Sequence, residues 1–189
     1  MLKGGKDGKG YTIADIEALP EGERAELIDG EWFWMDTPTW THQDILMHLA
    51  IEISLHIRKK KGNCKVLPAP FAVYIKKDKF NYVEPDISVI CDEEKKSEKG
   101  CQGAPDWTIE ILSPSSVKMD CERKVKLYRE AGVREYWIVD PKTETVTVYD
   151  FEHDAERKAG TEPKRYSFSD RIQAGIFEDL YLKLSEMDI

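Results

Sequence analysis

Isoleucine and leucine recur at every third or fourth position in the segment that begins at Thr41. This spacing predicts a long amphipathic helix, which ends near Gly62. A second helix is predicted over residues 117–131, because a serine-rich N-cap precedes it and Gly132 follows it. A shorter helix is predicted over residues 13–19.

The other apolar runs are short, rich in β-branched and aromatic residues, and bounded by turn-forming residues, which predicts strands. The Asp29-Gly30 pair inside the first run predicts a tight hairpin. Two prolines interrupt the second run, so its first half is predicted to lie at a sheet edge. The runs lie within residues 24–36, 66–78, 82–92, 104–112, 134–140, 144–152 and 165–168.

Strands and helices are mixed along the chain, with no internal repeat and no linker between them. We therefore predict a single α/β (α+β) domain over residues 11–189. Residues 1–10 are rich in glycine and lysine and contain no apolar segment, so we expect a disordered tail there.

The composition indicates a folded globular protein. The 189 residues are 41% hydrophobic and 10% aromatic, which is enough to form a core. The apolar runs are too short to span a bilayer, and no signal peptide precedes them. The four cysteines lie far apart without a Cys-x-x-Cys pair, which argues against a zinc site. A cytoplasmic protein with reduced thiols is expected.

The net charge of -8 argues against non-specific binding to nucleic acid. Two clusters, residues 58–65 and 76–79, are locally basic. A solvated surface is favoured for them over a patch that contacts DNA, although the second interpretation stays open.

Two acids occur where a buried strand would normally avoid them. Asp86 lies near the start of the run 82–92, and Glu110 lies inside the run 104–112. Carboxylates among apolar residues are costly unless a cation compensates them. Two of them on neighbouring strands would form the hard-oxygen site that Mg²⁺ or Mn²⁺ prefers.

The helix 117–131 carries the cation that could face these acids. At 100° per residue, Lys124 is the only basic residue within the apolar arc, and Asp120 lies at the edge of that arc. A lysine that reaches out to solvent is the alternative, but a working site is favoured. The arc contains Val117, Cys121, Val125, Leu127, Tyr128 and Ala131.

An ordered set of motifs resembles the Uma2 family, which belongs to the PD-(D/E)xK nuclease superfamily. The resemblance covers nearly the whole chain after Tyr11. The motifs are the segment Glu26–Glu31, the helix opening at His42, Pro85-Asp86, Glu110 followed by Ser113-Pro114-Ser115, the set Asp120, Lys124 and Tyr128, and Gly132-Val133 leading to Glu135-Tyr136-Trp137.

The resemblance implies a restriction-endonuclease-like mixed β-sheet flanked by helices, and a Mg²⁺-dependent (or Mn²⁺-dependent) endonuclease that hydrolyses phosphodiester bonds in DNA. It implies that Asp86, Glu110 and the backbone carbonyl of Ile111 bind the metal. The superfamily pattern places a lysine two residues after the second acid, where this chain has Leu112. Lys124 from the following helix matches the family's replacement for it.

The catalytic residues expected from the resemblance are therefore Asp86, Glu110 and Lys124. Glu26, Asp120 and His42 are possible additional members of the site. A histidine on the apolar face of a helix is more often a hydrogen-bonded core residue than a ligand, so His42 is the weakest of the three.

A second Pro-Asp pair, Pro105-Asp106, stands four residues before Glu110. Its acid would share one strand and one face with Glu110, whereas a metal needs ligands that converge from different segments. Asp86 is therefore preferred, and Asp106 is interpreted as a residue at the strand entry.

Two further functions stay open at this stage. One is a catalytically inactive nuclease fold that serves as a DNA-binding or assembly module, and the other is a metal-dependent hydrolase of small molecules. A homodimer is expected, since nucleases that cut both strands often pair two sites. The aromatic residues 32–34 could form its interface or belong to the core.

Overall fold

The computed structural model describes residues 10–114, 116–154 and 162–187. Except for Gly10, the tail predicted for residues 1–10 lies outside the described residues. No helix in the described ranges is long and apolar enough to cross a membrane.

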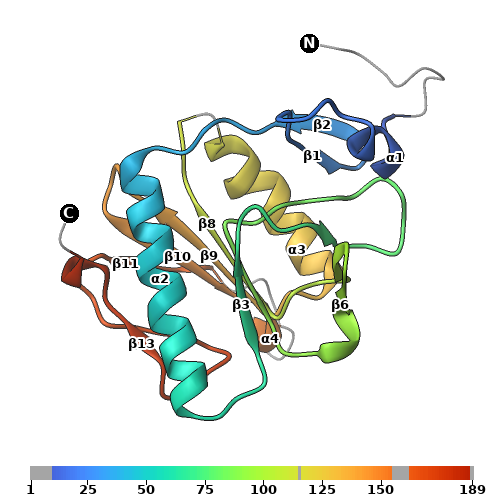
Figure 1. Ribbon diagram of the computed structural model, residues 1–189. Helices are drawn as coiled ribbons and strands as arrows, with labels where there is room; N and C mark the ends of the chain where they lie inside the picture. The colour runs from blue at the N-terminus through green and yellow to red at the C-terminus, as the bar shows by residue number, and fades with distance from the viewer. Residues whose placement is uncertain (1–9, 115, 155–161, 188–189) are drawn as a thin grey trace.

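A six-stranded mixed sheet forms the centre of the molecule, in the spatial order β11-β10-β9-β8-β5-β3 (Figure 1). β8 and β9 run parallel, and the other neighbouring strands are antiparallel. Its strands are β3 (Lys65–Pro68), β5 (Ile87–Ile90), β8 (Trp107–Ile111), β9 (Glu135–Asp140), β10 (Thr145–Asp150) and β11 (Lys164–Ser167).

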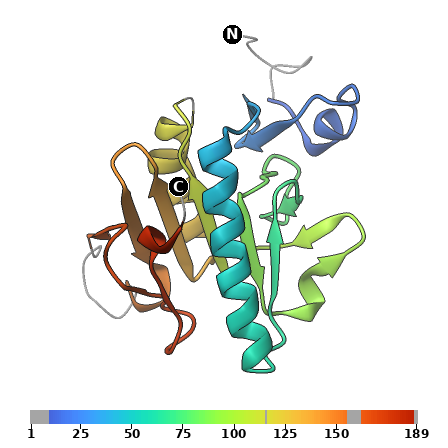
Figure 2. The same ribbon diagram turned by 60° about the vertical axis from the view of Figure 1, so that its left-hand side comes forward.

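Helices cover both faces of this sheet (Figures 1 and 2). α2 (Trp40–Lys59) lies on one face, and the π-helical η2 (Met119–Lys124), which continues into α3 (Val125–Ala131), lies on the other. Trp137 and Val139 of β9 belong to the hydrophobic core beneath α2. The alternate residues Tyr136 and Ile138 belong to the core beneath α3. The predicted mixed sheet with flanking helices is therefore confirmed.

Smaller elements surround the central sheet. β1 and β2 form the hairpin predicted at Asp29-Gly30, where both residues have positive φ angles of 50° and 78°. The elements are α1 (Ile13–Glu17), β1 (Ala25–Ile28), β2 (Glu31–Trp34), β4 (Val73–Tyr74), η1 (Glu93–Lys95), β6 (Lys96–Ser97), β7 (Gly100–Gln102), α4 (Phe151–Asp154), β12 (Ile172–Gln173), β13 (Tyr181–Leu182) and η3 (Leu184–Glu186).

Two predictions about secondary structure need correction. The run 66–78 is not one strand, because β3 joins the central sheet whereas β4 joins a separate three-stranded sheet with β7 and β6. On the segment 117–131, Val117 and Cys121 are exposed although the helical wheel placed them in the core. The wheel assumed 100° per residue, and the wider π-helical turn of η2 changes which side chains face inward.

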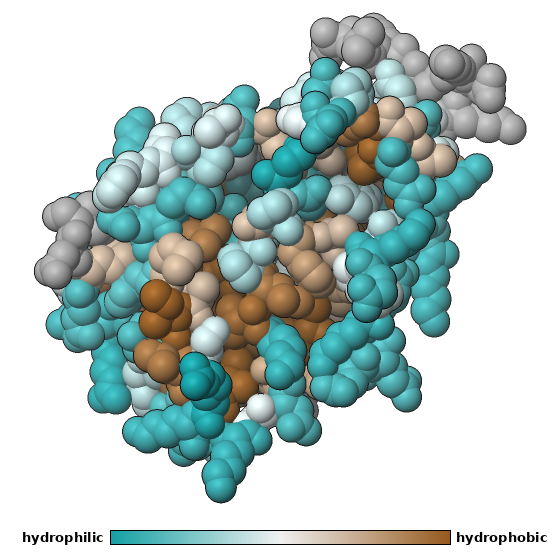
Figure 3. Space-filling model, in the orientation of Figure 1, coloured by the Kyte–Doolittle hydropathy of each residue, from teal (hydrophilic) through white to brown (hydrophobic). Residues whose placement is uncertain are grey.

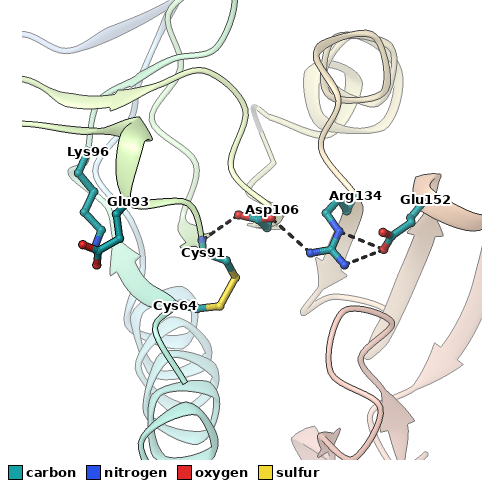
Figure 4. The surroundings of a disulfide bond; sticks show 7 residues. All are labelled: Cys64, Cys91, Glu93, Lys96, Asp106, Arg134 and Glu152. Atoms are coloured by element: carbon teal, nitrogen blue, oxygen red, sulfur yellow. Dashed lines mark hydrogen bonds and ion pairs between the residues drawn. A yellow bond between two sulfur atoms is a disulfide. The ribbon is translucent and has the colours of Figure 1, made fainter. Parts of the chain in front are cut away.

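The prediction of reduced thiols is wrong for two of the four cysteines. Cys64 and Cys91 form a disulfide, with their Cα atoms 3.9 Å apart (Figure 4). Antiparallel pairing of β3 with β5 aligns Lys65 with Ile90, so the residues just beyond each strand end face one another. Cys101 and Cys121 are free thiols.

Candidate active site

Lys124 lies at the centre of a buried cluster of charges. Its Nζ is 2.9 Å from Glu26 Oε2, 2.9 Å from Glu110 Oε1 and 3.3 Å from Asp120 Oδ1. The side chains come from β1, β8 and η2, and Lys124 is only 3% exposed. Three carboxylates therefore surround one ammonium group that water hardly reaches.

The backbone fixes how the acids of this cluster are presented. Glu110 faces α3 because its neighbours Ile109 and Ile111 face the core beneath α2. Glu26 lies in β1, whose four residues are all buried, and its Oε1 accepts a hydrogen bond of 2.9 Å from the backbone N–H of Glu84. The strands β8 and β1 thus direct Glu110 and Glu26 into the cluster, and the Glu84 N–H fixes the Glu26 carboxylate.

The hydroxyl of Tyr128 belongs to this cluster, although Tyr128 was named only as part of a motif and was not among the expected site residues. It donates a 2.6 Å hydrogen bond to Glu110 Oε1, the same oxygen that Lys124 contacts. Tyr128 follows Lys124 by four residues, a spacing that places both on one side of a helix. That spacing was the available signal, but an aromatic residue in an apolar arc is equally typical of a core.

Asp86 forms a second group of contacts beside the first. Its Oδ2 accepts a 2.7 Å hydrogen bond from the backbone N–H of Ile111 and lies 3.2 Å from His42 Nε2. The backbone N–H of Asp86 points to Glu110 Oε2 at 3.4 Å. Asp86, Glu110 and His42 are therefore adjacent, although they come from three separate segments of the chain.

Burial and charge shift the pKa values of these groups. Burial raises the pKa of Glu110 well above its usual range; Lys124 opposes this effect, and the carboxylates of Asp120, Asp86 and Glu26 add to it. Burial lowers the pKa of Lys124, but Glu110, Glu26 and Asp120 outweigh this and hold that pKa well above its usual range. Burial likewise lowers the pKa of His42, and the hydrogen bond and charge of Asp86 raise it above its ordinary value. Burial and the crowding of carboxylates around one ammonium group therefore both favour the protonated form of Glu110.

The residues present fit a hard divalent cation. The donor set consists of carboxylate oxygens, which suit Mg²⁺ and Mn²⁺, and these carboxylates outnumber the one ammonium group among them. Asp120 Oδ1 is buried without a hydrogen bond in the described part of the chain, although it lies within ion-pair distance of Lys124. The described ranges contain no group of three or more Asp, Glu, His or Cys side chains that could hold a metal ion by themselves. A metal held by Asp86 and Glu110 would need a backbone oxygen or water to complete its ligands.

The structure places Asp106 outside this cluster. Asp106 Oδ2 accepts a 2.8 Å hydrogen bond from the backbone N–H of Cys91, and Oδ1 lies 3.3 Å from Arg134 Nη1 (Figure 4). Arg134 also pairs with Glu152. Asp106 thus ties the start of β8 to neighbouring segments, as expected for a residue at the strand entry.

The first basic cluster does not lie beside the candidate site. Arg58 follows His42 by sixteen residues of α2, which corresponds to about 24 Å along the helix axis. Lys60 forms an ion pair with Asp179, which also lies 3.3 Å from His56 Nε2. This arrangement favours the solvated surface among the two interpretations of that cluster.

Comparisons with known proteins agree with the fold and the motifs. The model of the Uma2 family, described as "Putative restriction endonuclease", matches residues 13–183. A crystal structure described as a putative nuclease belonging to DUF820, from Anabaena variabilis, superposes with a TM-score of 0.73 at 23% identity, covering 94% of this chain and 97% of that one. An uncharacterized protein of Synechocystis is 25% identical over 152 residues, which is 80% of this chain and 76% of that protein.

Proposed function

The chain belongs to the Uma2 family, and from this premise we propose that it is a metal-dependent endonuclease that hydrolyses phosphodiester bonds in DNA. The observation that carries the proposal is the buried ammonium group of Lys124, held against Glu110, whose other carboxylate oxygen lies 3.4 Å from the backbone nitrogen of Asp86. Ionisable groups are seldom gathered in a protein interior without a chemical use.

Asp86, Glu110 and the backbone carbonyl of Ile111 would hold Mg²⁺ or Mn²⁺. When bound, the ion would polarise the scissile phosphate and lower the pKa of the attacking water. In the described part of the chain the side-chain contacts of Asp86 are made by Oδ2, which leaves Oδ1 available to a cation. The hydrogen bond from the Ile111 N–H to Oδ2 fixes the orientation of that carboxylate.

Lys124 would orient the attacking water and stabilise the negative charge that develops on the phosphate. Glu26 and Asp120 keep its ammonium group charged and in position, at 2.9 and 3.3 Å. Tyr128 holds Glu110 through its 2.6 Å hydrogen bond. His42 fixes Asp86 from the other side of the sheet, through Nε2.

A second candidate function is a catalytically inactive nuclease fold that serves as a DNA-binding or assembly module. The observation that favours this alternative is the burial of the charged cluster. Lys124 and Glu110 are each 3% exposed, so a phosphate group reaches them only if the surrounding segments open.

The test is cleavage of supercoiled plasmid and of single-stranded DNA with Mg²⁺ or Mn²⁺, with EDTA as the metal-free control. Asp86→Asn is the test variant, because it removes one charge and preserves the shape of the side chain. Asp106→Asn is the matched control, because it alters the other Pro-Asp acid, which lies outside the cluster.

Metal-dependent nicking that disappears with Asp86→Asn and persists with Asp106→Asn would support the proposed endonuclease. Nicking that Asp86→Asn leaves unchanged would remove Asp86 from the site. If folded wild-type protein shifts these DNAs in a gel but never cleaves them with either metal, the non-catalytic alternative replaces the endonuclease.

A further inference from the structure

α2 has an apolar face that is directed away from the rest of the molecule. Its inner face supplies the core, whereas Met47, Ile51 and Leu55 on the outer face are 50%, 47% and 51% exposed. Trp40, at the start of the helix, is 83% exposed. In Figure 2 the whole length of α2 lies at the front of the molecule, and Figure 3 shows apolar side chains gathered on the face where α2 and β3 lie in Figure 1.

These residues form one narrow line along the helix. At 100° per residue, six side chains fall within an arc of about 80° centred on Ile51. We call this line the outer stripe, and it consists of Trp40, Asp44, Met47, Ile51, Leu55 and Arg58. The spacing of three and four residues is that of helices that pack against another helix. A helix that only needed solubility would carry polar residues at these positions.

The outer stripe is complementary to itself when two copies run antiparallel. Met47 and Leu55 stand four residues before and after Ile51, and Asp44 and Arg58 stand seven residues before and after it. A two-fold axis at Ile51 therefore places Met47 against Leu55 of a second copy, and Asp44 against Arg58 of that copy. A parallel pair would instead bring Asp44 to Asp44 and Arg58 to Arg58.

Asp44 and Arg58 place one negative and one positive charge toward opposite ends of the outer stripe. Neither Asp44 nor Arg58 has an ion-pair partner among the residues that the structure describes. Trp40 stands eleven residues before Ile51, so the same axis places it near residue 62 of the second copy. That residue is Gly62, which has no side chain to obstruct an indole ring.

We propose that the outer stripe of α2 is the interface of a homodimer, in which two copies of this chain pair their α2 helices antiparallel about Ile51. His42 precedes Ile51 by nine residues and therefore points to the opposite side of the helix, toward Asp86. The interface leaves the candidate active site uncovered in both copies. The two sites lie at opposite ends of the helix pair, because His42 is in the first turn of α2.

Sedimentation equilibrium over a wide range of protein concentration tests this interface. The wild-type protein is expected to approach twice the chain mass of 21.8 kDa. Ile51→Glu places two like charges at the two-fold axis, and is expected to raise the dimer dissociation constant by at least about a hundredfold. Val117→Glu is the matched control, since Val117 is 46% exposed but lies outside the outer stripe, and it should leave the constant unchanged.

A charge exchange tests the antiparallel register. Asp44→Arg and Arg58→Asp should each raise the dissociation constant by about fivefold to tenfold, because each places like charges opposite one another. The protein that carries both changes should return to within about twofold of the wild-type constant, because opposite charges again face each other. Urea unfolding of every variant establishes that the exposed substitutions leave the fold intact.

A wild-type protein that stays at the chain mass at all concentrations would overturn the proposal. If the dimer persists with Ile51→Glu but dissociates with Trp34→Glu, the interface lies instead at the aromatic hairpin, where Trp34 is 53% exposed. If the variant with both Asp44→Arg and Arg58→Asp does not regain the wild-type dissociation constant, the antiparallel register is wrong. None of these measurements uses DNA cleavage, so the dimer and the endonuclease can fail independently.

Discussion

Replacing Lys124 with methionine tests whether the buried ammonium group holds the carboxylate cluster together. Methionine has a similar length and volume but no charge. The substitution leaves Glu26, Glu110 and Asp120 directed toward one another without a cation. Lys126→Met on the same helix is the matched control, because the Lys126 side chain is 74% exposed and lies 3.7 Å from Glu130.

The expected loss of stability depends on pH. Removing one partner of a buried ion pair costs about 3–5 kcal/mol. A buried carboxylate can escape part of this cost by taking up a proton, which costs about 3.7 kcal/mol near neutral pH but only about 1 kcal/mol at about pH 5, given an ordinary glutamate pKa of about 4.3. We therefore expect Lys124→Met to lose about 3–5 kcal/mol near neutral pH and about 1–2 kcal/mol at about pH 5. Lys126→Met should change the free energy of unfolding by less than about 1 kcal/mol at either pH.

Urea unfolding, followed by the fluorescence of the buried Trp107 and Trp137, measures these free energies. If Lys124→Met does not fold near neutral pH, the comparison is made at acidic pH and with the Glu26→Gln/Lys124→Met double variant. That variant should regain part of the loss, because it removes one uncompensated carboxylate. A Lys124→Met protein as stable as Lys126→Met, or one equally destabilised at both pH values, would refute the reasoning.

Three further predictions concern the free energy of unfolding. Without metal, the free energy of unfolding should fall as the pH rises from about 5 to about 8, because the raised pKa values of Glu110 and His42 mean that the folded state binds more protons than the unfolded state. In urea titrations, the free energy of unfolding of Glu110→Gln should depend less on pH than that of the wild type. A wild-type stability that rises with pH would contradict the prediction. Tyr128→Phe should cost about 1–3 kcal/mol in the same assay, since it leaves Glu110 without its 2.6 Å hydrogen bond. Gly132→Ala should cost about 1–2 kcal/mol of stability for its positive φ alone. Gly100→Ala should cost clearly more, because the added Cβ would lie 2.2 Å from a backbone oxygen. Equal losses for the two substitutions would contradict this prediction.

Much of the fold follows from local patterns in the sequence. The helix predicted from Thr41 is observed as α2, because isoleucine and leucine at helical spacing need a common core to cover them. The hairpin at Asp29-Gly30 is observed because both residues accept the positive φ angles that a tight turn requires. In both cases the signal lies within a few neighbouring residues.

Features that depend on contacts between distant segments were not predicted. The disulfide joins Cys64 to Cys91 across 27 residues, and only the pairing of β3 with β5 brings the two together. The three-stranded sheet of β4, β7 and β6 consists of strands of two or three residues, too short for any periodicity. The π-helical turn of η2 is a local feature, but it was missed because a four-residue spacing of charged residues suits it as well as an α-helix.

The candidate site was easier to anticipate than these features, because charged residues inside apolar segments stand out in a sequence. Glu26, Glu110 and Lys124 are each the exception in an apolar pattern, and the structure brings all three within ion-pair distance. Asp86 and His42 lie forty-four residues apart, and their contact at 3.2 Å depends on how α2 crosses the sheet. Their roles in catalysis stay predictions that the cleavage experiment tests.

In the proposed endonuclease, Lys124 would take the place of the lysine that the superfamily pattern puts on the strand. Leu112 stands two residues after Glu110, but it packs into the hydrophobic core beneath α3, and its N–H donates a 2.8 Å hydrogen bond to the Val139 carbonyl. The ammonium group comes instead from the helix opposite, where Asp120, Lys124 and Tyr128 follow one another at four-residue intervals. All three contact the charged cluster, so a shift of this segment by one residue would remove them together. The register of η2 and α3 against β8 is therefore what brings these three side chains to Glu110 together.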